Sequence, residues 1–547
     1  MDTISLGVAT RRRFLTRFGV LAGAGLALPL LQACGGGSPT ATAPAAAPTI
    51  AAAPTTAAAA PTAAGAAAAT AAPKPAAAAA ASPAAAPTAA AQAAPATVAS
   101  PTTAGATSGQ IIGQINVADV KKYSGQTIHL AVQKHTATDA IQQMSPSFTQ
   151  QTGINVNFEQ IPQQQMDQKQ LTDMSTGSGS YDVIGWFINP EYVENNWIYS
   201  VDELQQNANI TDTKLLAMDD FFGKFLDYYR YKDKLWGLPF YGESLMMYYN
   251  ADEFQKVGID KAPNTVDELE QACQKIKAAG RMAGIALRGS SEGNSEIYPF
   301  LAWVYGYGGS WVDQASNEVG LDKPETIAAG DAWGHFMRDY APPDVANYFW
   351  NEVQLAMQQE KAAIIMDATN FGPRLEDPAQ SKITGKVGFA QLPEKLGSDG
   401  KPLGPAQTKG RFGYSDAAYA LSVPRSSKQK EAAWLFSQWA TSPDVMLQTT
   451  QLGLRADPTR RSSLESPKFA EKYNYGTGDG SFAKNLAGAF ELAMPNYYPR
   501  LITGTQLGDT LGLALGQILT GQRSAKDAFA EAQQKSVDIQ KQAGLLK

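Results

Sequence analysis

A stretch from Ser38 to Gly109 limits where a folded core can lie in this 547-residue chain. It is almost entirely Ala, Pro, Thr, Ser and Gly, and Lys74 is its only charged residue. Such a segment has too few large apolar side chains to offset the entropy lost on ordering, and prolines interrupt its alanine runs. We therefore expect a disordered, partly polyproline-like stalk over residues 34–118, with a mean reach of about 50 Å. Roughly 430 residues of folded protein follow it, enough for two domains.

The N-terminal 33 residues have the pattern of an export leader. Thr10 to Leu15 reads T-R-R-R-F-L and precedes an uncharged apolar run that ends at Leu31. An arginine pair ahead of such a run is typical of twin-arginine export, and the run is shorter than the roughly 20 residues of a bilayer span. The alternative is a membrane-anchor helix, which Pro29 disfavours. Residues 1–33 are therefore predicted to be a signal peptide.

The sequence L-Q-A-C that ends at Cys34 resembles the bacterial lipobox. That resemblance implies cleavage before Cys34 and acylation of its thiol. The mature protein would then be extracytoplasmic and held by a lipid anchor on the outer face of the cytoplasmic membrane.

Charge and composition exclude several function classes. The formal charge is −6 and becomes −9 without the leader, which carries four Arg and one Asp. This acidity does not suit nucleic acid or anionic lipid as a partner. Cys273 is the only other thiol, so no intramolecular disulfide is expected. The three histidines form no metal-binding motif, and neither a metal nor a cofactor is predicted.

The folded part begins with a strand–helix–strand–helix–strand pattern. Apolar residues alternate over 128–132 and 154–158, and a helical face with Gly153 as its stop lies between them. A helix near 164–174 and a strand at 181–187 follow. Repeated units of this kind predict an α/β fold with a parallel sheet and ligands beyond the carboxyl ends of its strands.

A second α/β set is predicted further along the chain. It includes a hairpin around Lys232–Lys234, a strand at 245–249, and a helix that opens with the capping box Thr265/Glu268 and ends at Gly280. Cys273 lies on the apolar face of that helix and is expected in the core. Strands are expected at 284–287, 362–366 and 417–423. Helices are expected near 295–305, 327–340 and 428–440.

The sequence contains two patterns that could belong to an enzyme. Gly289–Gly293 matches G-x-S-x-G, but the only downstream histidine, His335, lies in the middle of a predicted helix without an acid placed to orient it. We expect this segment to be a polar turn that can present N–H groups to a ligand. The main enzyme alternative is an exported carbohydrate-active hydrolase that uses Glu243 and Glu296 as its two carboxylates.

Several segments, in order, resemble the extracellular solute-binding proteins of ABC importers, the broad group that includes the maltose-binding protein. These segments are T-G-I-N-V-N-F-E (152–159), Y-D-V-I-G-W (181–186), P-F-Y-G-E-S-L-M-M-Y-Y-N (239–250), E-I-Y-P-F-L-A-W-V-Y-G-Y-G-G (296–309), K-E-A-A-W-L-F-S-Q-W (430–439) and, near the C-terminus, M-P-N and L-T-G-Q-R-S-A-K-D-A-F. The resemblance covers residues 123–547.

The resemblance implies a fold, a function and a ligand site. The fold would have two lobes joined by interdomain crossovers around a hinge cleft, with residues 119–242 and 400–460 in lobe 1 and residues 243–399 and 461–547 in lobe 2. A monomer would capture a small solute by hinge closure and deliver it to an ABC permease, without chemistry. The implied ligand-binding residues are His135, Thr136, Trp186, Asn189, Tyr241, Glu243, Glu296, Tyr298, Trp303, Asp367, Asn370 and Phe371.

Departures from the maltose-type pattern bear on the solute. Asn189-Pro190 stands where an Asp-Arg pair is expected, Ala368–Phe371 replaces a Gly-x-Trp, and Leu507-Gly508 replaces an aromatic residue. We therefore expect a different neutral solute, such as a monosaccharide, a polyol or a short oligosaccharide.

Overall fold

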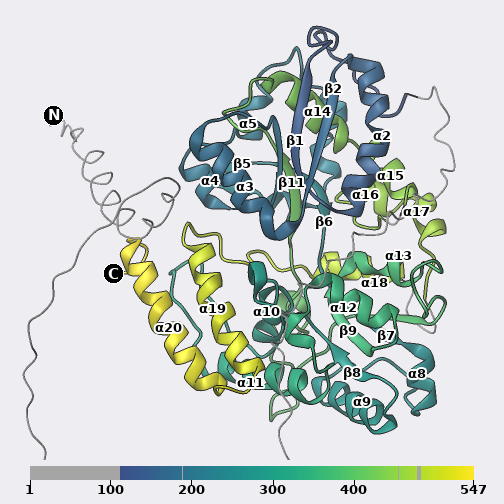
Figure 1. The fold of residues 1–547 in the computed structure, drawn as a ribbon, viewed down its shortest axis with the longest axis vertical. Coiled ribbons are helices and arrows are strands. Elements are labelled where there is room, and N and C mark those ends of the chain that lie inside the picture. The colour runs from purple at the N-terminus through teal and green to yellow at the C-terminus, as the bar shows by residue number, and fades with distance from the viewer. Residues whose placement is uncertain (1–110, 188, 454, 477–481) are drawn as a thin grey trace, which may run out of the picture. The chain divides into compact units, whose positions relative to one another are not determined.

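The computed structural model describes residues 111–187, 189–453, 455–476 and 482–547, which form two α/β lobes (Figure 1). The predicted signal peptide, Cys34 and most of the predicted stalk lie outside these residues. Lobe 1 contains a five-stranded sheet. Its strands, in spatial order, are β2 (Asn155–Ile161), β1 (Thr127–Gln133), β3 (Val183–Trp186), β11 (Ala418–Ser422) and β6 (Leu238–Gly242).

Helices from two distant parts of the chain cover the lobe 1 sheet. In Figure 1, α14 (Lys430–Ala440) lies close to α2 (Thr136–Thr152) and β1 although some 280 residues separate them, and α14 contacts α2. The larger helices of this lobe are α2 (Thr136–Thr152), α3 (Gln163–Thr176), α14 (Lys430–Ala440) and α15 (Pro443–Gln451). The shorter ones are α4 (Pro190–Glu194), α5 (Val201–Leu204), α6 (Thr213–Leu216), η1 (Met218–Asp220), α7 (Gly223–Tyr228), α16 (Arg461–Leu464) and α17 (Pro467–Lys472).

Lobe 2 contains a four-stranded sheet. Its strands, in spatial order, are β10 (Val387–Ala390), β7 (Leu245–Asn250), β9 (Ala362–Ala368) and β8 (Ala283–Ala286). Its helices are α8 (Ala251–Lys256), α9 (Val266–Ala279), η2 (Glu292–Asn294), α10 (Ile297–Gly306), α11 (Pro324–Asp339), η3 (Val345–Asn347), α12 (Trp350–Gln358), η4 (Thr369–Phe371), α13 (Gly372–Leu375), η5 (Ala406–Thr408), α18 (Phe482–Leu492), α19 (Gly504–Leu519) and α20 (Ala525–Gln542). The C-terminal pair α19 and α20 packs on α11 (Figure 1).

Local signals in the sequence set many of these boundaries. Gly153 and Gly280 end α2 and α9 with φ of 76° and 68°, a conformation that glycine adopts without steric cost. Thr265 and Glu268 form the predicted capping box. Lys232 and Asp233, both at positive φ, turn the hairpin of β4 (Arg230–Tyr231) and β5 (Lys234–Leu235).

The two sheets are mixed, which corrects the expectation of a parallel sheet. β1 pairs in parallel with β2 and β3, and β8 pairs in parallel with β9. β11 is antiparallel to both β3 and β6, and β7 is antiparallel to β9 and β10. The antiparallel pairs arise because β6, β7 and β11 flank passages of the chain between the lobes.

The chain passes between the lobes at several points. β6 and β7 flank Glu243 and Ser244 and belong to different sheets, on either side of the predicted 242/243 boundary. The chain returns from lobe 2 to lobe 1 at Ala417 rather than near residue 400. The reason is that the segment up to Gly413 packs on α10 of lobe 2, where Gly413 N–H donates to Ala302 C=O. Residues 461–472 lie with lobe 1, since α16 and α17 contact α15. Contacts of α18 with β7 place the rest of the C-terminus in lobe 2.

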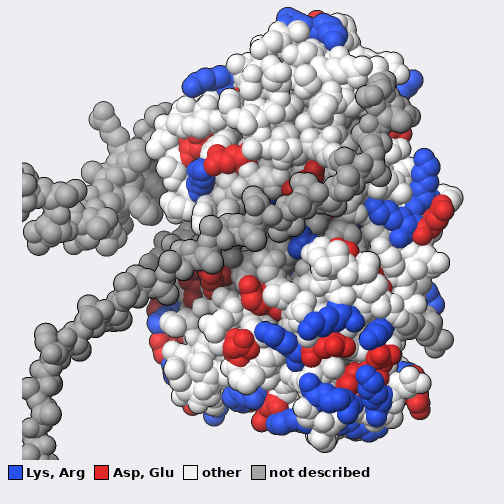
Figure 2. All heavy atoms as spheres, turned by 45° about the vertical axis from the view of Figure 1, so that its right-hand side comes forward, with Lys and Arg blue, Asp and Glu red and all other residues white. Residues whose placement is uncertain are grey.

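The surface seen in Figure 2 carries both signs of charge. Lys and Arg side chains are interspersed with Asp and Glu over the lower lobe on that face. Among the described residues, no helix is both long enough and apolar enough to span a bilayer.

Candidate functional site

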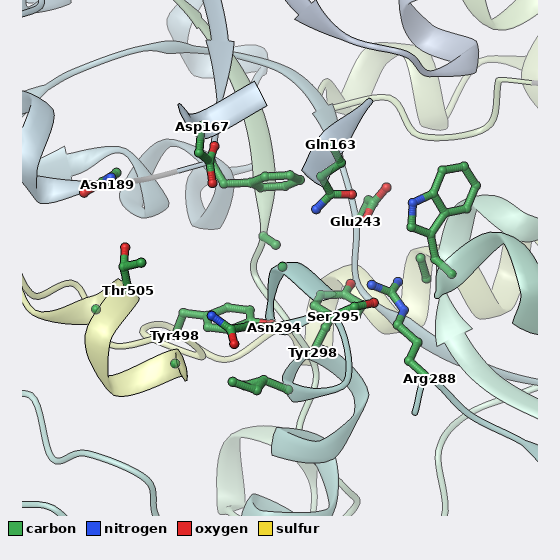
Figure 3. A pocket seen from close by; sticks show the side chains of 18 of the residues that line it. Gln163, Asp167, Asn189, Glu243, Arg288, Asn294, Ser295, Tyr298, Tyr498 and Thr505 are labelled. Carbon is green, nitrogen blue, oxygen red and sulfur yellow. The ribbon is translucent and has the colours of Figure 1, made fainter. Parts of the chain in front are cut away.

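A cavity of about 270 Å³ lies between the lobes, and we call it the cleft cavity. Figure 3 shows Asp167 and Asn189 of lobe 1 facing Asn294, Tyr498 and Thr505 of lobe 2. Lobe 1 also contributes Gln133, His135, Gln163, Phe187, Pro190 and Tyr228. Lobe 2 also contributes Arg288, Gly293, Ser295, Ile297, Tyr298, Trp311, Trp350, Ala368, Asn370, Phe371, Pro499, Leu501, Gly504 and Gly508, and the crossing segments contribute Glu243 and Ala417. Walls from both lobes mean that a bound solute would stabilise their approach.

Six of the predicted site residues line this cavity. They are His135, Asn189, Glu243, Tyr298, Asn370 and Phe371. Glu243 comes from the segment between β6 and β7, and Asn370 and Phe371 come from η4, which directly follows β9. Both segments lie where a strand end meets the opposite lobe, as expected for ligands of α/β sheets.

Glu243, Asn370 and His135 form a contact network at the base of the cavity. Asn370 Nδ2 donates to Glu243 Oε1 at 2.8 Å and lies 2.9 Å from His135 Nε2. The His135 ring stacks on Tyr241 with its centroid 4.2 Å away. Burial, together with the positive charge of Arg374 and Arg455, lowers the pKa of His135 to about 3, so its imidazole is neutral near pH 7.

The carboxyl group of Glu243 has a pKa above the ordinary value for glutamate. Burial raises its pKa to about 7 against the opposing charge of Arg288. Arg288 itself is held by Asp367, with its Nε 2.9 Å from Oδ2, and its guanidinium lies 4.7 Å from the centre of the Tyr298 ring. Because its pKa is about 7, the carboxyl group of Glu243 is partly protonated near neutral pH and can both accept a hydrogen bond from a hydroxyl group and donate one to it.

The other six predicted residues do not line the cavity. Trp186 is fully buried in lobe 1, where its Nε1 donates to Ser422 Oγ at 2.7 Å and its ring stacks on Tyr192. Trp303 is fully buried in lobe 2 against Phe336 and Phe412. Neither indole lines the cleft cavity, because both are packed in the cores of the lobes.

Three of the remaining four lie directly behind residues of the cavity wall. Tyr241 donates its hydroxyl to Gln133 Oε1 at 2.6 Å, and Asp367 holds Arg288. Thr136 begins α2 next to His135. Each contacts or adjoins a lining residue, and none of the three lines the cleft cavity itself.

Glu296, the sixth, is enclosed between α10 and α19. Its side chain is 1% exposed, and both carboxylate oxygens lack a hydrogen-bond partner. A Cβ added to Gly512 of α19 would lie 2.7 Å from Glu296 Oε1, so a larger residue there would have to displace this carboxyl group. Burial raises the pKa of Glu296 to about 8. Glu243 and Glu296 therefore do not face one cleft, which removes the geometry of the hydrolase alternative.

Glu296→Gln is expected to make the unfolding free energy less dependent on pH. The folded-state pKa lies above the ordinary value, so the stability that the protonated form contributes is present at low pH and is lost as pH rises toward about 8. The wild type should therefore lose stability relative to Glu296→Gln by on the order of 1.4 kcal/mol per pH unit within this window. Urea denaturation at pH 5, 6, 7 and 8 measures this, with Glu465→Gln at an exposed position as control. The same dependence of the unfolding free energy on pH in wild type and Glu296→Gln would contradict the burial of this carboxyl group.

Sequence reasoning missed most of the aromatic and polar wall. The missed residues with the clearest chemistry are Gln163, Asp167, Phe187, Tyr228, Arg288, Asn294, Trp311, Trp350, Tyr498 and Thr505. For Phe187 a signal was present: it directly follows Trp186, and successive side chains of a strand point to opposite faces, so one of the two had to face away from the core.

The G-x-S-x-G segment is a turn, as predicted, and Gly293 at its end lines the cavity. His335 lies on α11, where its Nε2 is 3.0 Å from Glu270 and its Nδ1 is 2.7 Å from Asp339. Two acids therefore contact His335, although the sequence showed no acid placed to orient it, and His335 does not line the cavity. Among the described residues no group of three or more His, Cys, Asp or Glu side chains is placed to hold a metal ion.

Two mixed sheets joined by crossing segments around a cavity define a two-lobe binding protein. Residues 131–447 match the family model described as bacterial extracellular solute-binding protein. This match covers more than half of the chain, and the chain therefore belongs to that family.

Relatives and solved structures agree with this assignment. A mannitol-binding protein of Pseudomonas aeruginosa is 26% identical over 438 residues, which cover 77% of this chain and 94% of that protein. An erythritol/L-threitol-binding protein of Mycolicibacterium smegmatis is 24% identical over 369 residues, 64% of this chain and 73% of that protein. An ABC transporter solute-binding protein of Agrobacterium vitis with bound D-mannitol has a TM-score of 0.66 and 25% identity, and the match covers 77% of this chain and 99% of that one.

A second structure of the same kind supports the fold. It is the ABC transporter solute-binding protein of Agrobacterium radiobacter in complex with ribitol, with a TM-score of 0.66, 23% identity, and coverage of 76% of this chain and 99% of that one. The predicted two-lobe α/β fold is thereby confirmed, as is the predicted role in solute capture for an ABC importer.

Proposed function

We propose that this protein binds an acyclic polyol or a small sugar in the cleft cavity and presents it to an ABC permease without altering it. The observation that carries this proposal is a closable cavity whose walls combine aromatic rings with carboxylate and amide groups. Aromatic faces pack on the C–H groups of a polyol, and Glu243, Asp167 and Asn370 can pair with its hydroxyls. The names of the mannitol-, ribitol- and erythritol-binding relatives support this class of solute.

A thermal-shift series tests the solute class directly. We would measure unfolding with erythritol, ribitol, D-mannitol, D-glucose and maltose. A solute present at 100 times its dissociation constant adds about 2.7 kcal/mol to the unfolding free energy. We expect such a shift with at least one polyol or monosaccharide and none with maltose. Release of product from any oligosaccharide, abolished in Glu243→Gln, would instead indicate a hydrolase.

The protein is further proposed to act as a monomer tethered outside the cytoplasmic membrane. The support is the twin-arginine leader, the lipobox-like L-Q-A-C and the Ala/Pro/Thr-rich stalk. Mass spectrometry of the membrane fraction should find a mature chain that begins at an acylated Cys34, and Cys34→Ala should release the protein from that fraction.

Glu243→Ala is expected to weaken polyol binding without a large loss of stability. Removing one charge-assisted acceptor from the cavity should cost about 1.5–3 kcal/mol, roughly ten- to a hundredfold in dissociation constant. The ligand-free unfolding temperature should change little, because the carboxyl group is already half protonated near pH 7. Calorimetry with the polyol found by thermal shift measures the change, and Glu465→Ala on the surface of lobe 1 is the control. Equal affinity in Glu243→Ala and wild type would contradict a role for this carboxyl group in binding.

A further inference from the structure

A second cavity of about 300 Å³ adjoins the cleft cavity, and we call it the mouth pocket. It shares Gln133, His135, Gln163 and Trp350 with the cleft cavity. Its other walls come from both lobes, so it also changes shape when the lobes move. A solute seated in the cleft cavity can therefore extend a substituent into the mouth pocket.

Arg374 is a partly buried cation in the wall of the mouth pocket. It lies on α13 and is half-buried, and burial lowers the pKa of its guanidinium. Within the described part of the chain, the guanidinium donates no hydrogen bond and has no carboxylate within 4.0 Å. Asp139 and Asp377 act on it only through space. A partly desolvated cation without a partner is unfavourable, and an anion that entered the pocket would relieve this cost.

Other groups around Arg374 add positive potential. Lys134 lines the same pocket. His135 is the N-cap of α2, and Trp350 and Asn351 are the first two residues of α12, so the N-terminal ends of two helices border the pocket. Helix N-termini favour anions through their free N–H groups and their dipole. These ends reinforce the unpaired guanidinium and do not define the site by themselves.

Asp139 is a negatively charged residue in the wall of the mouth pocket, opposite in sign to Arg374 and Lys134. It lines the pocket in the first turn of α2 and accepts a hydrogen bond from Gln160 Nε2 at 3.0 Å. Two cations still outnumber this one carboxylate. The cleft cavity has the reverse balance, because Glu243 and Asp167 line it while its one cation, Arg288, is neutralised by Asp367.

We propose that the mouth pocket is an oxyanion subsite, in which Arg374 and Lys134 bind a carboxylate or phosphate. The occupant is the terminal acidic group of a polyol or sugar whose hydroxylated part lies in the cleft cavity. This inference rests on the proposed function of the cleft cavity, and it extends the solute class from neutral polyols to aldonates and polyol phosphates.

Calorimetry with matched ligands tests the subsite. The ligands are D-mannitol, D-gluconate, D-mannitol 1-phosphate and inorganic phosphate, and the proteins are wild type, Arg374→Gln and the exposed control Arg461→Gln. We expect Arg374→Gln to weaken binding of gluconate or mannitol 1-phosphate ten- to a hundredfold and to change mannitol binding less than twofold. Arg374-dependent binding of inorganic phosphate alone would also support the oxyanion site, with a free anion as its occupant.

Asp139→Asn separates the subsite from a simple latch between the lobes. If Arg374 served to pair with Asp139 on closure, Asp139→Asn would weaken binding of mannitol and of the acidic ligands alike. The oxyanion subsite instead predicts severalfold tighter binding of the acidic ligands in Asp139→Asn, because a repelling carboxylate is removed.

The outcomes also separate this inference from the proposed function. Binding of mannitol together with no Arg374-dependent binding of any anion would overturn the subsite and leave the polyol site intact. Failure of every polyol to bind, with Arg374-dependent binding of phosphate, would contradict the proposed solute class and retain the oxyanion site.

Discussion

Trp186→Ala should lower the unfolding free energy of lobe 1 by about 3–5 kcal/mol and leave the affinity of the folded protein for its solute within about twofold of wild type. The indole is fully buried, so its removal leaves a cavity and also removes the hydrogen bond from its N–H to Ser422 Oγ. Urea denaturation measures the loss, and calorimetry well below the unfolding transition measures affinity.

Phe187→Ala is the matched comparison, one residue further along the chain. Phe187 lines the cleft cavity and is only half-buried, so its truncation should weaken solute binding and cost less stability. The reverse result, in which Trp186→Ala weakens binding more than tenfold at nearly unchanged stability, would show that Trp186 and not Phe187 faces the solute.

Asp367→Ala should destabilise lobe 2 by about 3–5 kcal/mol, because it leaves the buried Arg288 guanidinium without its partner. Arg288 is held through its Nε by both oxygens of Asp367, and the side chains are 8% and 0% exposed. Burial is the main cause of the raised pKa of Glu243, and the negative charge of Asp367 raises this pKa further. Asp367→Ala removes that negative charge and leaves the positive charge of Arg288, which lowers the pKa of Glu243. Glu243 should therefore ionise at a lower pH in Asp367→Ala.

A double-mutant cycle isolates the Arg288–Asp367 interaction. Arg288→Met combined with Asp367→Leu replaces the ion pair with apolar side chains and should recover most of the stability lost in the single variant Asp367→Leu. Denaturation of Arg288→Met, Asp367→Leu and the double variant gives the coupling free energy. Equal losses in Asp367→Leu and the double variant would mean that the cost comes from packing and not from an unpaired charge.

Many of the helices and strands could be predicted from local sequence patterns. The alternation over 128–132, the capping box of Thr265 and Glu268, and the glycines that end α2 and α9 all depend on neighbours within a few residues. Such signals retain their meaning whatever the rest of the chain does, because backbone sterics and local hydrogen bonds decide them. The resemblance to solute-binding proteins then supplied the two-lobe arrangement.

Pairing between strands that are far apart in the sequence could not be predicted from these local rules. β11 is separated from its neighbours β3 and β6 by well over 100 residues, and its antiparallel direction follows from the route of the chain through the hinge. The position at which the chain returns to lobe 1, Ala417, could not be predicted from the sequence either. The segment before it packs on α10 through contacts between residues that are far apart in the chain.

The sequence by itself determined that this protein is an acidic two-lobe α/β binding protein, with Glu243 at a crossing between lobes and a site rich in aromatic, carboxylate and amide groups. Only the tertiary structure decided which of those groups line the cleft cavity. It buried Trp186, Trp303 and Glu296, and it exposed Phe187 and Arg374 to cavities. The physical reason is that a side chain's role depends on which neighbours desolvate it, and those neighbours come from elements far away in the chain.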